Sequence, residues 1–125
     1  MVGSKARVKI KDQRRGRSSR EKLSKIAGII LAHPGLKIEV EGHADTTGGP
    51  AINQPLSEKR ADTVRTYLVG QGVDSGAITA KGFGDTKPVA DNGTAAGRQV
   101  NRRVELVVNG PLLTTPNATN SDGRQ

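Results

Sequence analysis

Two short stretches of the chain alternate strictly between apolar and charged residues. In residues 6–11 and again in residues 36–41, every second residue is apolar and the residues between them are charged. This alternation predicts two strands, each with one buried face and one face in solvent. The basic outer row of the first strand is typical of an exposed sheet edge.

Two longer stretches instead carry apolar residues at spacings of three and four, which predicts helices. In the first, Ser18 or Ser19 is placed to cap the helix and Pro34-Gly35 to end it. In the second, Ser57 is placed as the cap and the helix ends near residues 70–72. The apolar faces are formed by Leu23, Ile26, Ala27, Ile30 and Leu31, and by Ala61, Val64, Tyr67 and Leu68.

The remaining segments are interpreted as two loops, two strands and a tail. Residues 42–54 and 84–97 are rich in glycine and small polar residues, which favours loops. Ile78–Phe83 and Arg103–Asn109 are predicted strands. The segment from Gly110 to the end is rich in Thr, Asn, Ser and Gly, and we expect residues 110–125 to be a disordered tail.

The predicted order is therefore βαβαββ. This order indicates an α/β fold, a two-layer sandwich in which a mixed four-stranded sheet carries two helices on one face. The loop after the second strand then lies at that strand's carboxyl end, where sheets of this kind usually bind ligands.

Composition excludes several classes of function. The 125 residues suffice for one domain, and the absence of cysteine excludes disulfides, thiol nucleophiles and cysteine-ligated metals. The two histidines are too few for a histidine-rich metal site, so we expect no metal and no cofactor. No apolar run approaches the length of a membrane span, and residues 1–25 are too charged for a secretory signal.

The net charge of +8 is confined to the N-terminal segment. Residues 1–25 contain ten basic and two acidic residues, whereas the rest of the chain contains ten of each. A basic arm over residues 1–17 can contact an anionic polymer or surface, either nucleic acid or acidic membrane, and this is the alternative function. Specific nucleic-acid recognition is not expected, because Tyr67 and Phe83 are the only aromatic residues.

Four short motifs, taken together and in order, resemble the OmpA-like domain, the peptidoglycan-associating module of Gram-negative envelopes. Gly82-Phe83-Gly84 and Pro88 also lie at the usual spacing, and the resemblance covers residues from about 20 to 108. The motifs are Gly42-His43-Ala44-Asp45, Gly48 with Asn53, Leu56-Ser57-Glu58-Lys59-Arg60-Ala61, and Asn101-Arg102-Arg103-Val104-Glu105.

The resemblance implies a non-enzymatic domain, over residues 18–109, that binds peptidoglycan non-covalently. It implies that the ligand is the diaminopimelate residue of the stem peptide, and that the domain tethers an envelope protein to the cell wall. It also implies a location in the periplasm or at the cell outer membrane. The implied contacts are Asp45 and Arg60 first, with Asn53, Thr47 and Arg102 around them.

The chemistry of these residues suits that ligand. Diaminopimelate carries an ammonium and a carboxylate on one carbon. Asp45 can bind the ammonium, and Arg60 can bind the carboxylate through a bidentate contact. If Ser57 caps the helix, Arg60 lies in its first turn, where backbone N–H groups also favour a carboxylate.

The N-terminal segment departs from the family. The usual first strand with alternating phenylalanines and the following Leu-x-Pro turn are both absent from residues 1–19. Three alternatives stay open for the first strand: it is shortened, rebuilt, or exchanged between two chains of a homodimer.

Each candidate also has a purely structural alternative. Asp45 can cap a turn, Arg60 can be a solvated helix residue, and Asn53 can close the loop by bonding its own backbone. Arg102 and Arg103 point to opposite faces of a strand, so only one reaches the site. We favour Arg102, which leaves Arg103 to pair with Glu105 or another acid. We expect His43 to be a strand-end residue beside the site.

Overall fold

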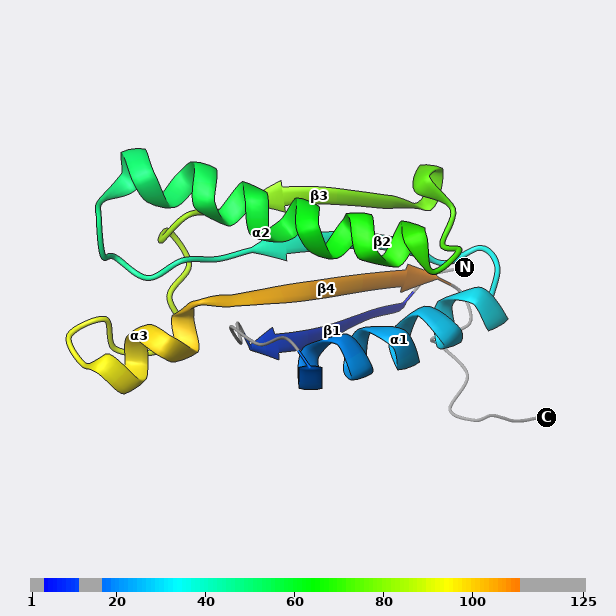
Figure 1. Ribbon diagram of the computed structural model, residues 1–125, viewed down its shortest axis with the longest axis horizontal. Helices are drawn as coiled ribbons and strands as arrows, with labels where there is room; N and C mark the ends of the chain where they lie inside the picture. Colours follow the sequence, from blue (N-terminus) through cyan, green and yellow to red (C-terminus); the bar gives the residue numbers. More distant parts are fainter. Residues whose placement is uncertain (1–3, 12–16, 111–125) are drawn as a thin grey trace.

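The computed structural model describes residues 4–11 and 17–110 (Figure 1). A short 3₁₀ turn, Ser75–Ala77, precedes the third strand. The other elements of the described ranges are β1 (Ser4–Lys11), α1 (Arg17–Ala32), β2 (Lys37–Gly42), α2 (Pro50–Gly70), β3 (Ile78–Gly82), α3 (Ala95–Asn101) and β4 (Arg103–Gly110).

The strands form one mixed sheet in the order β1-β4-β2-β3. Strand β4 runs antiparallel to both β1 and β2, and β2 runs parallel to β3. Helices α1 and α2 lie on the same face of this sheet, as Figure 1 shows. The predicted two-layer architecture is therefore confirmed.

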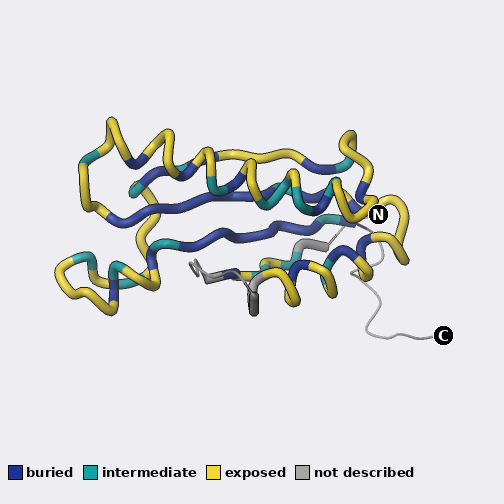
Figure 2. The backbone as a smooth tube through the Cα atoms, viewed as in Figure 1, coloured by how far each residue is buried: buried dark blue, intermediate teal, exposed yellow. Residues whose placement is uncertain are grey.

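The core lies between the sheet and these two helices. Every second residue of β2 and β4 points into it, including Ile38, Val40 and Leu106, which are at most 2% exposed. Helix α1 contributes Leu23, Ala27 and Ile30, and helix α2 contributes Ala61 and Leu68. Figure 2 shows that β2 and β4, the two central strands, are buried along most of their length. The apolar half of the alternation faces this core. The other face of these central strands is also largely buried, with Glu41 and Glu105 only 6% and 5% exposed, so the predicted solvent face is wrong there.

The basic N-terminal segment supplies β1, which pairs with β4 of the same chain. Ala6 lies opposite Val108, and Ile10 lies opposite Val104. Ile10 joins the core, whereas Arg7 and Lys9 are exposed. A strand at this edge is thus present within one chain, and its exchange in a homodimer stays a prediction.

Several predicted boundaries are wrong. Helix α2 begins at Pro50, not near Ser57, because Gly49 adopts a φ of +79° and the fixed φ of proline suits a first helical turn. Ser57 is therefore an internal, fully buried residue of α2 and not its cap. Helix α1 likewise begins at Arg17, so Ser18 and Ser19 lie within it.

Helix α3 is not among the predicted elements, and its first residues fall in the loop predicted over residues 84–97. Thr94 caps it by accepting a hydrogen bond from the Gly97 backbone N–H at 2.9 Å. The predicted disordered tail lies outside the described residues, apart from Gly110, which ends β4. In the part of the chain that the structure describes, the helices are too short or too polar to cross a membrane.

Candidate functional site

The candidate site lies in the connection between β2 and α2, at the carboxyl end of β2. The chain leaves the sheet at Gly42 and turns through Gly48 and Gly49, whose φ angles of +89° and +79° favour glycine. Asp45 lies within this connection, and Asn53 lies in the first turn of α2. The sequence prediction that this loop opens at the end of a strand is correct.

Asp45 is the buried anion of the site. Its side chain accepts hydrogen bonds from the Thr47 backbone N–H at 2.8 Å and from Arg102 Nη1 at 2.6 Å. Burial by itself raises the pKa of Asp45, but the Thr47 N–H and the Arg102 guanidinium outweigh it, so the pKa lies below its usual value. Asp45 is therefore a carboxylate at neutral pH.

Arg60 approaches the same loop from the middle of α2. Its Nη1 donates to the backbone carbonyl of His43 at 3.2 Å, two residues before Asp45. Because α2 begins ten residues earlier, at Pro50, the predicted contribution of a first helical turn around Arg60 is wrong. Arg60 is half-buried, and the free backbone N–H groups of the helix start are too far along the helix to act with it.

The other predicted residues occupy different positions around Asp45. The Thr47 side chain is exposed, and its backbone contacts Asp45. Asn53 is buried, and its Nδ2 donates to Asp85 Oδ2 at 3.2 Å, which ties the start of α2 to the loop after β3. The structure thus joins Asp45, Thr47 and Arg102 directly, whereas Asn53 contacts Asp85.

A close approach between α2 and two strand ends fixes the geometry of this region. A side chain at Gly42 would collide with the Ser57 backbone carbonyl, and one at Gly82 would collide with Ser57 and Glu58. Ser57 Oγ donates to the Gln54 carbonyl and accepts from the Gly84 backbone N–H, both at 2.8 Å. Ser57 therefore fastens the loop after β3 to the helix.

Asn101 is a structural residue of the site that sequence reasoning missed. Its side chain is fully buried and accepts from the backbone N–H groups of Val89 and Ala90 at 2.8 and 3.0 Å. Its Nδ2 donates to the Ala90 carbonyl and to Asn92 Oδ1. Asn101 thus holds the loop after β3 against α3, and its place in the Asn-Arg-Arg motif was the available signal.

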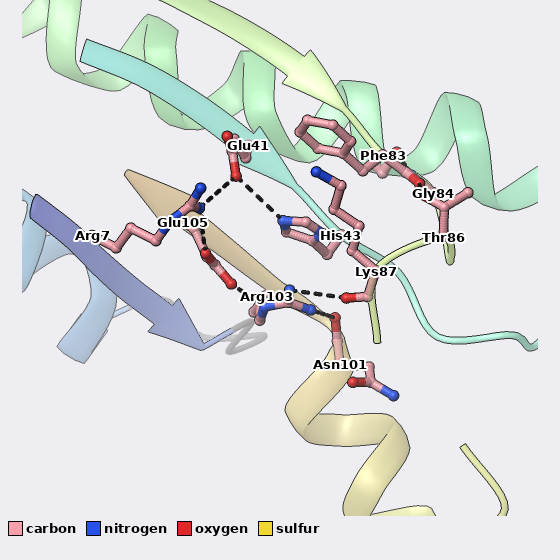
Figure 3. Close-up of polar contacts among 11 residues, drawn as sticks. Arg7, Glu41, His43, Phe83, Gly84, Thr86, Lys87, Asn101, Arg103 and Glu105 are labelled. Atoms are coloured by element: carbon pink, nitrogen blue, oxygen red, sulfur yellow. Dashed lines mark hydrogen bonds and ion pairs between the residues drawn. The ribbon is translucent and has the colours of Figure 1, made fainter. Parts of the chain in front are cut away.

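A second polar cluster lies on the sheet face opposite α1 and α2 (Figure 3). Glu41 and Glu105 are direct neighbours across β2 and β4, an arrangement that is unfavourable for two like charges. Arg7 Nη1 lies 3.0 Å from an oxygen of each, and Arg103 Nε donates to Glu105 at 2.6 Å. Arg103 therefore pairs with Glu105, the alternative weighed for the arginine that does not reach the site.

His43 lies at the border between the two clusters. Its backbone carbonyl accepts from Arg60, while its ring is 2% exposed and stacks on Phe83 with centroids 5.4 Å apart. Burial, reinforced by the nearby positive charge of Arg103, lowers the pKa of His43 to about 4. The imidazole is therefore neutral at pH 7, packed beside the site as expected.

The groups gathered at the loop suit binding of a zwitterion. Asp45 offers a carboxylate to a cation, and Arg60 and Arg102 offer guanidinium groups to an anion. Arg102 is about one-third exposed, so its guanidinium is accessible from solvent. An amino-acid head group, with an ammonium and a carboxylate on one carbon, matches this set of charges.

Comparison with known proteins identifies relatives of this domain. The model of the OmpA family matches residues 16–102. Outer membrane porin F of Pseudomonas fluorescens is 51% identical over 83 residues, which cover 66% of this chain and 26% of the porin. The peptidoglycan-binding protein ArfA of Mycobacterium tuberculosis is 44% identical over 89 residues, which cover 71% of this chain and 27% of ArfA. The chain thus spans about a quarter of the length of these relatives.

A solved structure shares the architecture over nearly its whole length. The peptidoglycan-associated lipoprotein from Burkholderia pseudomallei aligns with a TM-score of 0.73 and 29% identity. The alignment covers 80% of this chain and 88% of the lipoprotein chain.

Proposed function

The chain belongs to the OmpA family, and on that premise we propose that it is a binding domain, not an enzyme, that holds an envelope protein to peptidoglycan by non-covalent contacts. Two relatives support this proposal by their names, the peptidoglycan-binding protein ArfA and the peptidoglycan-associated lipoprotein. The relation to an outer membrane porin and to a lipoprotein supports a place in the periplasm, at the cell outer membrane.

The observation that carries the finer proposal is the buried Asp45 carboxylate with two guanidinium groups around it. Diaminopimelate is the stem-peptide residue with a free ammonium and carboxylate on one carbon. In this proposal Asp45 accepts the ammonium, and Arg60 and Arg102 donate to the carboxylate. In the same proposal the exposed Thr47 lies at the rim of the site, and the buried Asn53 supports it from below through its bond to Asp85.

Before the ligand binds, Asp45 is paired with Arg102. Asp45 is 7% exposed at its side chain, whereas Arg102 is 36% exposed and can turn toward an incoming carboxylate. The ligand's ammonium then takes over the contact that Arg102 releases. One charged contact is exchanged for another, so the affinity of each domain is moderate, and firm attachment to the wall requires many domains.

Co-sedimentation with purified sacculi tests the proposed binding. Asp45→Ala and Arg60→Ala are each expected to weaken it about tenfold or more, the cost of losing a hydrogen bond to a charged group. Arg65→Ala is the matched control. Arg65 lies on α2 like Arg60, but its guanidinium bonds the Ile78 and Ser75 carbonyls, toward the other end of the helix. Folded Asp45 and Arg60 variants that sediment like the wild type would show that the site is elsewhere.

Soluble muropeptides test the choice of ligand. Lysine-type stem peptides lack the second carboxylate, which leaves the guanidinium groups without an anion, and a site built for a charged group rejects such an analogue. We expect tighter binding of diaminopimelate-containing peptides in NMR titrations, with shifts at Asp45, Asn53 and residues 57–61. Equal affinity for lysine-type peptides would leave wall binding in place but refute the diaminopimelate contact.

The alternative, contact with an anionic polymer through the basic arm, stays a prediction. In the described part of the arm Lys9 is exposed, whereas Arg7 has partners within the chain.

A further inference from the structure

Three side chains of the types that bind metal ions meet on the sheet face opposite the two long helices. Glu41 and His43 come from β2 and the residue after it, and Glu105 comes from β4. All three are buried, with exposed fractions of 6%, 2% and 5%. One potential ligand atom of each lies within 4.8 Å of the others.

His43 provides the observation that distinguishes this cluster from an ordinary acidic pair. Neither ring nitrogen has a hydrogen-bond partner among the described residues, although the ring is buried. Nε2 points toward Glu41, whose Oε1 is 3.8 Å away, too long for a hydrogen bond (Figure 3). A buried polar atom without a partner is costly, and a metal ion bound by one nitrogen would provide that partner.

Arg7 marks where a cation is held in this cluster. Its Nη1 lies 3.0 Å from Glu41 Oε1 and 3.0 Å from Glu105 Oε1, so one nitrogen bridges the two carboxylates. The Arg7 side chain is 53% exposed, and it reaches the cluster from the edge strand β1. It can therefore leave without disturbing the core, whereas the two glutamates cannot.

We propose that Glu41, His43 and Glu105 bind a divalent transition-metal ion of the Zn²⁺ type, which replaces the Arg7 guanidinium between the two carboxylates. One imidazole nitrogen with two carboxylate oxygens is a ligand set that Zn²⁺ accepts, whereas Mg²⁺ and Ca²⁺ prefer oxygen ligands alone. Solvent, reaching the cluster where Arg7 leaves, provides the fourth ligand.

The charges of the cluster allow this exchange. Glu41 and Glu105 carry two negative charges, and Arg7 and Arg103 balance them. Arg103 stays in place, because it is also bound to the carbonyls of Asn101 and Lys87. Replacing Arg7 by a divalent ion adds only one positive charge at a position open to solvent. The site does not depend on the proposed peptidoglycan binding.

Titration calorimetry with Zn²⁺ at pH 7 tests the site. We expect one Zn²⁺ per wild-type chain and a loss of affinity of about tenfold or more in His43→Phe, which keeps an aromatic ring against Phe83 but has no ligand atom. His33→Ala is the matched control, because His33 is the only other histidine and is exposed. Binding that survives His43→Phe and disappears in His33→Ala would overturn the proposal.

Two further measurements keep the test decisive if His43→Phe does not fold. In the wild type, Zn²⁺ is expected to shift the ¹⁵N signals of the His43 ring, and an unchanged His43 ring at saturating Zn²⁺ would refute the site. Arg7→Met removes the competing cation, so the affinity for Zn²⁺ should rise, by up to about fivefold for a half-exposed ion pair. An unchanged or lower affinity in this variant would refute the exchange with Arg7.

Discussion

Replacing Gly82 by alanine tests the close contact that positions the loops of the candidate site. A Cβ atom at Gly82 would lie 2.5 Å from the Glu58 backbone nitrogen and 2.6 Å from Ser57 Oγ. Ordinary contacts begin at 3.4 Å, so β3 and α2 must separate by about 0.9 Å, the difference between 3.4 and 2.5 Å. Overpacking of this kind typically costs about 1–3 kcal/mol.

The same substitution at Gly28 is the matched control. Gly28 lies within α1, and a Cβ atom there meets nothing within 4 Å. Alanine favours a helix over glycine by about 0.5–1 kcal/mol, so Gly28→Ala should raise the free energy of unfolding. The two variants are therefore expected to differ by about 1.5–4 kcal/mol, with opposite signs relative to the wild type.

Urea unfolding followed by circular dichroism measures both changes. Gly82→Ala should also loosen the bond between Ser57 Oγ and the Gly84 N–H, so NMR shifts are expected from Gly84 to Asp85. A Gly82→Ala domain as stable as the wild type, with unchanged signals at Gly84, would refute the view that α2 and β3 are held at this separation.

Two further predictions concern buried polar side chains. The pKa of His43 is lowered to about 4 in the folded chain, so as the pH falls the unfolded chain takes up a proton on His43 before the folded chain does. The free energy of unfolding should therefore fall as the pH drops from about 6.5 to 4, by about 3 kcal/mol at most. His43→Phe should flatten this dependence in urea unfolding at several pH values and His33→Ala should not, and an equally steep profile in His43→Phe would contradict the assignment. Asn101→Ala removes four hydrogen bonds and should lower the free energy of unfolding by about 2–4 kcal/mol, whereas Gln99→Ala, an exposed neighbour on α3, should change it little. Equal stability of these two variants would show that the loop held by Asn101 contributes nothing.

The sheet and its two covering helices could be predicted from the sequence because they depend on short-range patterns. Alternation over residues 36–41 places Ile38 and Val40 on one face, whatever the rest of the chain does. The three- and four-residue spacing that begins at Leu23 similarly defines the buried face of α1. The ordered motifs around Asp45 and Arg60 were sufficient to indicate the OmpA family.

Helix boundaries were less predictable because glycine and proline are common both in loops and at the start of a helix. Residues 48–55 have the composition of a loop, yet Gly49 supplies a left-handed turn and Pro50 begins α2. Pro55 lies inside the helix, in a region that the bonds of Asn53 and Ser57 hold to the loop after β3. These contacts come from residues about 30 positions away, which local propensity does not register.

The arrangement of charges was decided by tertiary structure alone. Asp45 and Arg102 are 57 residues apart, and only the pairing of β2 with β4 brings them within 2.6 Å. The same pairing places Glu41 opposite Glu105, and β1, at the edge of the sheet, brings Arg7 within 3.0 Å of both. Sequence patterns determine which face of each element is buried, whereas electrostatic partners depend on the register between strands that are distant along the chain.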